Sequence, residues 1–278
     1  MAGQEKSERR FEMSLEIAAE RSQVWKAIAE ADHVSRWFAP DVDMETRAGG
    51  DVRWSWRGLH DWPLTVEQVR EGEFLRMRYA SSVATDDGAA PLFVDWELAG
   101  SGGTTTLRLV HHGFGPEAEF DAEYDGISQG WPVELRSLRN YVENHFGRTR
   151  RLAWSLAGID LDLDEAWRRL SGPDALGCGA DVQALSEGDA FEFTTADGDR
   201  FAGHVLCAFP RELSGRLTSH GDAFLRVGVE VCGGSPQVWL WLATYGADAS
   251  ATEGVQQRWD AMLARVFADC RTTAEAAH

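Results

Sequence analysis

Two adjacent histidines, His111 and His112, are the residues of this sequence best suited by type and setting to proton transfer. They end an alternating segment, residues 104–112, that is typical of a β-strand. Neighbouring strand residues point to opposite faces, so at most one of the two imidazoles faces an enclosed space. Two interpretations of His111 stay open: a structural hydrogen bond, or contact with a ligand or substrate as a general acid or base. His60, two residues before Trp62, lies in a predicted loop and could border the opening of such a space.

Asp95 and Glu97 form the second candidate arrangement, because they alternate on one predicted strand on either side of Trp96. Two carboxylates on one face could share acid and base roles. The other interpretation is a pair of solvated charges on the outer face of a sheet, with Arg76 and Arg78 as their cross-strand partners. We favour the second interpretation, because Trp96 takes the opposite, inward face.

Metal, phosphate and nucleophile motifs do not appear in the sequence. The four cysteines form no C-x-x-C pair, and no histidine stands at zinc-like spacing from them: Cys178, Cys207, Cys232 and Cys270. We find neither a glycine-rich phosphate loop nor a G-x-S-x-G turn. We therefore expect no metal, no cofactor and no assigned catalytic residue.

Charge and hydropathy narrow the class of protein. The chain of 278 residues has 45 acidic and 27 basic residues and a net charge of −18. Such an excess repels a phosphate backbone, so we expect no nucleic acid partner. No apolar run reaches the ~18 residues of a membrane span, and the polar opening MAGQEKSERR lacks a signal-peptide core, so a cytoplasmic protein is expected. The acidity fits either an ordinary cytosolic protein or adaptation to high internal salt.

A long helix over residues 125–145 is the element that the other candidates depend on. Its apolar residues recur at steps of three or four and share one stripe: Ile127, Trp131, Leu135, Leu138 and Val142. Pro132 suits the opening turn of this helix, where a missing N–H costs nothing. A helix with such a stripe needs a broad apolar surface to lie on.

The residues before this helix predict that surface. A strand over residues 11–17 leads to a helix over 23–30 with Ser22 as its N-cap, and Asp32 caps a short helix through Trp37. Antiparallel strands follow, at residues 42–46, 51–57, 64–69, 74–80, 92–98 and 104–112. A twisted antiparallel sheet of this kind can curl around one long helix and leave a space between them.

Large side chains are predicted on the inward faces of these elements. For each one alone, ordinary core is the simpler interpretation, but together they could line an apolar pocket for a small ligand. The predicted lining residues are Trp37, Trp54, Trp56, Tyr79, Trp96, His111, Phe114, Trp131, Leu135 and Leu138.

The second half of the chain resembles a divergent copy of the first. A strand over residues 152–161 leads to a capping box, Asp162 with Glu165, and a short helix. Strands follow at residues 190–194, 200–209, 212–217, 224–231 and 237–244, and then a helix over 252–270 with the stripe Val255, Trp259, Leu263, Val266 and Cys270. This stripe repeats the spacing of the first long helix, although amphipathic helices also recur by coincidence. We predict tandem domains over residues 10–148 and 152–270.

Several short segments of the first half also resemble a known family. They are Val24-Trp25 through Trp37-Phe38, Gly49-Gly50 before an aromatic strand, Leu107 to His111 with Gly113-Phe114, and Gly130-Trp131 followed by Leu135, Leu138 and Tyr141. In order and spacing they resemble the activator of heat-shock-protein-90 ATPase homologue-like family, within the START and polyketide cyclase-like (SRPBCC) superfamily. The resemblance implies an α+β protein of two tandem helix-grip domains. Each is a curved antiparallel sheet wrapped around a long C-terminal helix, and the second is divergent.

Function is less determined than fold, because this superfamily includes binders, enzymes and co-chaperones. We expect a non-catalytic protein that binds a small hydrophobic or aromatic ligand between helix and sheet. One alternative is a cyclase- or hydrolase-type enzyme that uses the same cavity, with His111 or a carboxylate as acid and base. Another is a chaperone-associated stress-response or protein-interaction module, with a chaperone or a second copy of the chain as partner. Independently of these alternatives, we expect the second domain to have lost its cavity and to serve as a scaffold or a dimer surface.

Overall fold

The computed structural model describes residues 9–57, 59–85, 88–232 and 235–272. The chain divides between Phe146 and Gly147 into two compact units, which we call unit 1 and unit 2. No described helix is both long and apolar enough to cross a membrane. Residues 1–8, which carry most of the prediction about a signal segment, lie outside the described residues.

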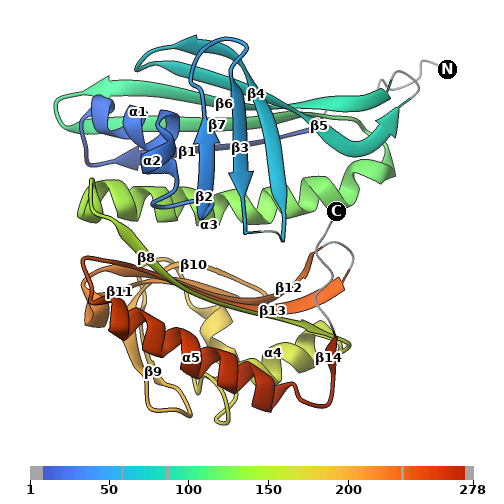
Figure 1. The fold of residues 1–278 in the computed structure, drawn as a ribbon, viewed down its shortest axis with the longest axis vertical. Helices are drawn as coiled ribbons and strands as arrows, with labels where there is room; N and C mark the ends of the chain where they lie inside the picture. Colours follow the sequence, from blue (N-terminus) through green and yellow to red (C-terminus); the bar gives the residue numbers. More distant parts are fainter. Residues whose placement is uncertain (1–8, 58, 86–87, 233–234, 273–278) are drawn as a thin grey trace. The chain divides into compact units, whose positions relative to one another are not determined.

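Unit 1 is an antiparallel sheet that grips one long helix (Figure 1). Its elements are β1 Arg9–Ile17, α1 Arg21–Ala29, α2 Ala31–Val34, β2 Asp41–Met44, β3 Asp51–Ser55, β4 Asp61–Arg70, β5 Phe74–Thr85, β6 Gly88–Ser101, β7 Thr104–Phe114, η1 Ala118–Phe120 and α3 Asp121–His145. The strand order is β1-β7-β6-β5-β4-β3-β2, so that hairpins link β2 to β7 in sequence and β1 closes the sheet beside β7. The predicted antiparallel meander followed by a long helix is confirmed.

Helix α3 presents the predicted stripe to the sheet. Trp131, Leu135, Leu138 and Val142 are 3%, 0%, 0% and 4% exposed, and each such side chain contributes about 1.5–3 kcal/mol by leaving water. The helix begins at Asp121, four residues before the predicted start. The placement of Pro132 in the first turn was therefore wrong, because Pro132 lies inside the helix. A proline there costs one backbone hydrogen bond and a clash with the preceding turn, which the buried stripe on both sides of it offsets.

The predicted caps of the two short helices were also wrong. The N-cap of α1 is Glu20 instead of Ser22, because Glu20 has the extended backbone that a cap needs and forms a reciprocal capping box with Gln23. Asp32 lies in the first turn of α2, whose N-cap is Glu30. Polar residue types therefore predicted the approximate start of each helix. The backbone angles determine which residue is the N-cap.

The acidic pair on β6 belongs to the outer face of the sheet. Asp95 forms a two-pronged ion pair with Arg76, with N–O distances of 2.7 and 2.6 Å, and Glu97 pairs with Arg108 at 2.7 Å. The predicted partnership of Arg78 was wrong, since Arg78 pairs with a glutamate of β4. Asp95 is only 5% exposed, so this charge is not solvated as predicted. Each carboxylate is paired with an arginine, and Glu97 shares Arg108 with Glu12, which does not suit an acid–base pair.

Unit 2 repeats the arrangement of unit 1. Its elements are β8 Arg150–Ile159, α4 Leu163–Ser171, η2 Ala180–Ala184, β9 Ala190–Thr194, β10 Arg200–Phe209, β11 Glu212–Leu217, η3 Thr218–His220, β12 Ala223–Cys232, β13 Ser235–Tyr245, α5 Ala249–Val266 and β14 Arg271–Thr272. The strand order β14-β8-β13-β12-β11-β10-β9 again places the first strand beside the last long strand of the meander. The predicted tandem of helix-grip domains is confirmed. Helix α5 ends at Val266, so Cys270 does not lie on its stripe, and buried Phe267 comes directly after the helix instead.

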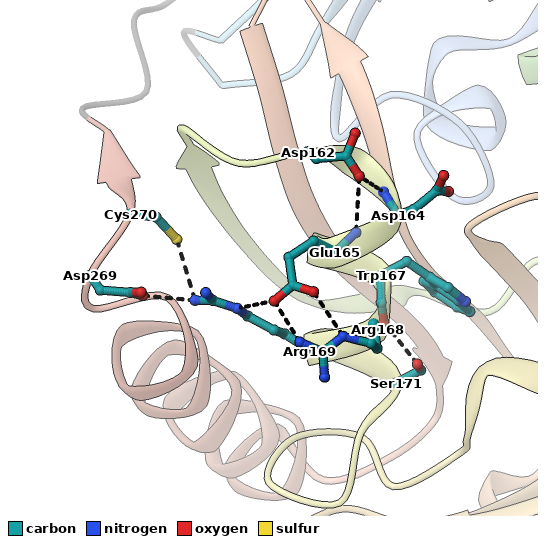
Figure 2. A network of polar contacts seen from close by, with 9 residues as sticks. All are labelled: Asp162, Asp164, Glu165, Trp167, Arg168, Arg169, Ser171, Asp269 and Cys270. Atoms are coloured by element: carbon teal, nitrogen blue, oxygen red, sulfur yellow. Dashed lines mark hydrogen bonds and ion pairs between the residues drawn. The ribbon is translucent and has the colours of Figure 1, made fainter.

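The start of α4 shows how unit 2 ties its helix ends together (Figure 2). Asp162 caps the helix by accepting hydrogen bonds from two first-turn N–H groups, at 2.9 and 3.2 Å. The carboxylate of Glu165 points to Arg168 and Arg169 and not back to the cap, so only half of the predicted capping box forms. Arg169 also bonds Asp269 at 2.8 Å, which joins α4 to the segment after α5.

Gly126 offers a direct test of the gripped helix. It is an exposed interior residue of α3, and a Cβ added there would have nothing within 4 Å. Glycine costs a helix about 1 kcal/mol relative to alanine, so Gly126→Ala should raise the free energy of unfolding of unit 1 by about that amount in urea titrations. Gly50→Ala is the matched control, because its Cβ would lie 2.1 Å from the carbonyl oxygen of Glu45 and should destabilise the unit. A neutral or destabilising Gly126→Ala would contradict the described helix.

Candidate functional site

Five aromatic side chains meet between α3 and the inner face of the sheet, and we call them the aromatic cluster: Phe38, Trp54, Trp62, Trp96 and Trp131. Phe38 lies edge-to-face with Trp54 at 5.0 Å between ring centroids and stacks on Trp131 at 5.6 Å. Trp54 meets Trp62 at 5.3 Å, and Trp96 meets Trp131 at 5.4 Å. These spacings are in the range where aromatic pairs attract one another.

Strand register brings the cluster together. Trp54 on β3 is the direct cross-strand partner of Trp62 on β4. Trp62 shares the inner face with Leu64 and Val66 by simple alternation, and both of these are buried. Trp131 reaches the same space from α3. The cluster therefore forms only when sheet and helix are both in place.

A chain of hydrogen bonds runs from the cluster to its edge. The indole Nε1 of Trp131 donates to Nδ1 of His111 at 2.9 Å. An indole nitrogen can only donate, so Nδ1 is unprotonated and the proton of a neutral ring sits on Nε2. His111 Nε2 then donates to the hydroxyl of Tyr79 at 3.0 Å, and Tyr79 donates to Oε1 of Glu123 at 3.3 Å. Because the indole N–H of Trp131 can only donate, it determines which group donates in each of the following hydrogen bonds.

Burial keeps the middle of this chain neutral. His111 is 0% exposed; burial, with a smaller effect from His112, lowers the pKa of His111 to about 3. Burial also raises the pKa of Tyr79 above its usual value, and the nearby charge of Glu123 adds to this. Both ring nitrogens of His111 are already engaged. The arrangement therefore supports a structural hydrogen-bonding role for His111 over acid–base chemistry.

The chain ends on a carboxylate that faces hydroxyl groups. Ser81 donates to Oε2 of Glu123 at 2.5 Å, and Ser82 approaches the same oxygen at 3.4 Å. Glu123 itself is half-buried. These residues were absent from the prediction, because β5 runs to Thr85 beyond its predicted end and α3 starts before its predicted beginning.

The structure places the predicted lining residues in two groups. Eight of them are at most 7% exposed on inner faces: Trp54, Tyr79, Trp96, His111, Phe114, Trp131, Leu135 and Leu138. Trp56 lies just beyond β3 and is half-buried against Phe38, with ring centroids 5.2 Å apart. Trp37 is buried, stacks on Phe38 with ring centroids 5.1 Å apart, and lies edge-to-face with Trp96 at 6.3 Å. Its Nε1 donates to the carbonyl of Ala27 at 2.8 Å.

Two members of the cluster, Phe38 and Trp62, were absent from the prediction. The alternation of Trp62 with Leu64 and Val66 was the signal that could have identified Trp62. Phe38 follows a helix end, where no periodic pattern predicts the direction of a side chain.

Two buried donors in the cluster lack an acceptor. The indole N–H groups of Trp54 and Trp96 have no hydrogen-bond partner within the described part of the chain. The two side chains are 2% and 1% exposed. An unsatisfied buried donor costs about 1–3 kcal/mol. Four indole N–H groups of unit 2 also lack a partner among the described residues: those of Trp154, Trp167, Trp239 and Trp259.

The cysteines of unit 2 occupy separate environments. Cys207 is buried, and burial raises the pKa of the Cys178 thiol to about 12. The side chain of Cys232 lies outside the described residues. Within residues 9–57, 59–85, 88–232 and 235–272, no three His, Cys, Asp or Glu side chains are arranged to hold a metal ion.

The architecture of unit 1, a curved sheet around a long C-terminal helix, is the helix grip of START-like proteins. Residues 18–143, which make up most of unit 1, match the family described as Activator of Hsp90 ATPase homolog 1-like protein, so this part of the chain is similar to that family. No curated protein matches the chain.

Several solved structures are similar to the chain at low identity. The Aha1 dimer from Colwellia psychrerythraea is 16% identical, with 49% of this chain and 96% of that chain covered and a TM-score of 0.42. DynU16, a putative protein in the dynemicin biosynthetic locus, is 16% identical over 93% of this chain and 96% of its own, with a TM-score of 0.42. The di-domain ARO/CYC BexL from the BE-7585A biosynthetic pathway is 15% identical over the same shares, 93% and 96%, with a TM-score of 0.41.

The buried state of His111 predicts a pH dependence. The unfolded chain takes up a proton near the ordinary histidine pKa of 6.5, while the folded ring stays neutral to about pH 3. Between these values the unfolded state binds more protons, so this contribution is fully present above pH 6.5 and is lost as the pH falls, by at most ~1.4 kcal/mol per pH unit. His111→Gln cannot titrate, so its free energy of unfolding, measured with urea from pH 7 to pH 5, should fall less steeply than that of the parent. Parallel curves would contradict a neutral buried ring.

Proposed function

We propose that unit 1 binds a small aromatic molecule that carries a hydrogen-bond acceptor, such as a carbonyl oxygen, and that it binds this molecule without transforming it. The observation that carries the proposal is the pair of buried N–H groups on Trp54 and Trp96 that lack an acceptor in the described residues. Both N–H groups lie among aromatic rings. A flat aromatic ligand with an acceptor atom would pack against these rings and accept a hydrogen bond from an indole N–H.

The half-buried edge of the cluster is the place where such a molecule would make its first contacts. Trp56 and Trp62 are both half-buried. Trp62 lies edge-to-face with Tyr79 at 5.0 Å, so its ring connects the cluster to the chain of hydrogen bonds. Indole rings give large contact areas at little cost in side-chain entropy.

Binding without reaction is supported by the state of the polar groups. His111 is neutral and uses both ring nitrogens within the protein. The raised pKa of Tyr79 disfavours its ionised form. General acid–base catalysis needs a group poised near the working pH, and neither of these two side chains is so poised.

The experiment is a calorimetric titration of the full chain with hydroxyanthraquinones and flavonoids, which combine fused rings with carbonyl oxygens, and with saturated fatty acids for comparison. We expect the aromatic ketones to bind, and Trp62→Ala to weaken binding by about tenfold or more, since a well-packed ring contributes at least ~1.4 kcal/mol. Trp239→Ala is the matched control, because it removes a half-buried indole from β13 of unit 2 and should leave the affinity unchanged.

Trp62→Phe keeps a ring at the edge and separates lost contact from lost folding. It should retain more affinity than Trp62→Ala at an unchanged unfolding midpoint. Failure of every aromatic ketone to bind, or equal loss in the Trp62 and Trp239 variants, would overturn the proposal.

A further inference from the structure

Glu123 is a half-buried carboxylate whose protein partners are all neutral. It accepts hydrogen bonds from Tyr79, Ser81 and Ser82. In the described ranges of the chain, no arginine, lysine or histidine lies within ion-pair distance of it. Two of the three donors come from residues that are at most 7% exposed, so this carboxylate is held in place by groups that cannot move far.

The nearby acidic residue Asp121, unlike Glu123, has an arginine as its ion-pair partner. Asp121, two residues before Glu123, pairs with Arg9 at 2.6 Å. Arg9 also donates to the carbonyls of Gly115 and Glu117, and its guanidinium lies over the ring of Tyr124 at 5.2 Å. The arginine at this end of α3 is therefore committed, and Glu123 has no side-chain counterion among the described residues. Glu123 lies in the first turn of α3, where the helix dipole favours a negative charge.

A carboxylate can accept about four hydrogen bonds, and the three hydroxyls leave room for one more. The ring of Trp62 lies beside Tyr79, the residue that donates to Glu123. A carboxylate that lacks a side-chain counterion in the described residues suits a cation, which would gain a charge-assisted hydrogen bond from it.

We infer that the aromatic ligand carries a basic nitrogen and that Glu123 binds this nitrogen as an ammonium group. The inference rests on the proposed function, since it places the cation of the ligand at the edge of the aromatic cluster. The net charge of −18 favours the approach of a cation and opposes that of an anion. A neutral hydroxyl could occupy the same position, but it would not compensate the charge.

The test compares three compounds that share one naphthalene ring and differ in the end of a short side chain: an arylethylamine, an arylethanol and an arylacetate. We titrate each into the full chain at neutral pH and low salt. The arylethylamine should bind about tenfold tighter than the arylethanol, or more, as expected for one charge-assisted hydrogen bond. The arylacetate should bind weakest.

Glu123→Gln keeps an oxygen for the hydroxyl donors and removes the charge. It should reduce the preference for amine over alcohol to within about threefold while leaving the affinity for the arylethanol unchanged. Glu119→Gln is the matched control, since it removes the same charge from an exposed residue of η1 nearby and should keep the preference.

The outcomes separate this inference from the proposed function. Equal binding of the amine and the alcohol by the parent protein overturns the inference alone. An equal loss of the preference for amine over alcohol in the Glu119 and Glu123 variants also overturns it. The preference would then come from the net negative charge of the protein and not from one carboxylate. If none of the three compounds binds, the proposed function fails and the inference fails with it. The comparison within the parent protein needs no variant, so a poorly folded Glu123→Gln does not prevent the test.

Discussion

The hydrogen bond from Trp131 to His111 is the interaction on which the inside of unit 1 depends. A buried indole N–H and a buried imidazole are each costly without a partner, and here each satisfies the other at 2.9 Å. Trp131 comes from the helix and His111 from β7, so the bond also sets the position of α3 along the sheet. It fixes the tautomer of His111, and through it the direction of every donor as far as Glu123.

The first half of α3, which carries Glu123, contains residues that lower helix stability, and the second half does not. Gly126, Gly130 and Pro132 all lie in the first half, whereas residues 133–145 contain neither glycine nor proline. Glycine and proline lower helix stability, and local opening follows local stability. The half that carries Glu123 therefore has the lower intrinsic helix stability and depends more on tertiary contacts, such as those of Trp131, than the half that carries Leu135 and Leu138.

The two units share a topology but not this chemistry. In unit 2 the helix tryptophan, Trp259, is 1% exposed and lies 6.1 Å from the ring of Phe201. Its indole N–H has no hydrogen-bond partner in the described part of the chain. Unit 1 gives the equivalent indole an imidazole acceptor. Both units therefore have a buried tryptophan on the long helix, but the series of hydrogen bonds from Trp131 to Glu123 is described in unit 1 alone.

The sequence by itself determined the strands, the two long helices and their inward stripes, because alternation and three-to-four spacing record which face of an element leaves water. It also indicated the tandem. Tertiary structure decided the partners of His111, the inclusion of Trp62 and the role of Glu123. Tyr79, His111 and Glu123 are far apart in sequence, and only strand register and the position of α3 bring their side chains together. Local patterns report burial, whereas such contacts depend on long-range geometry.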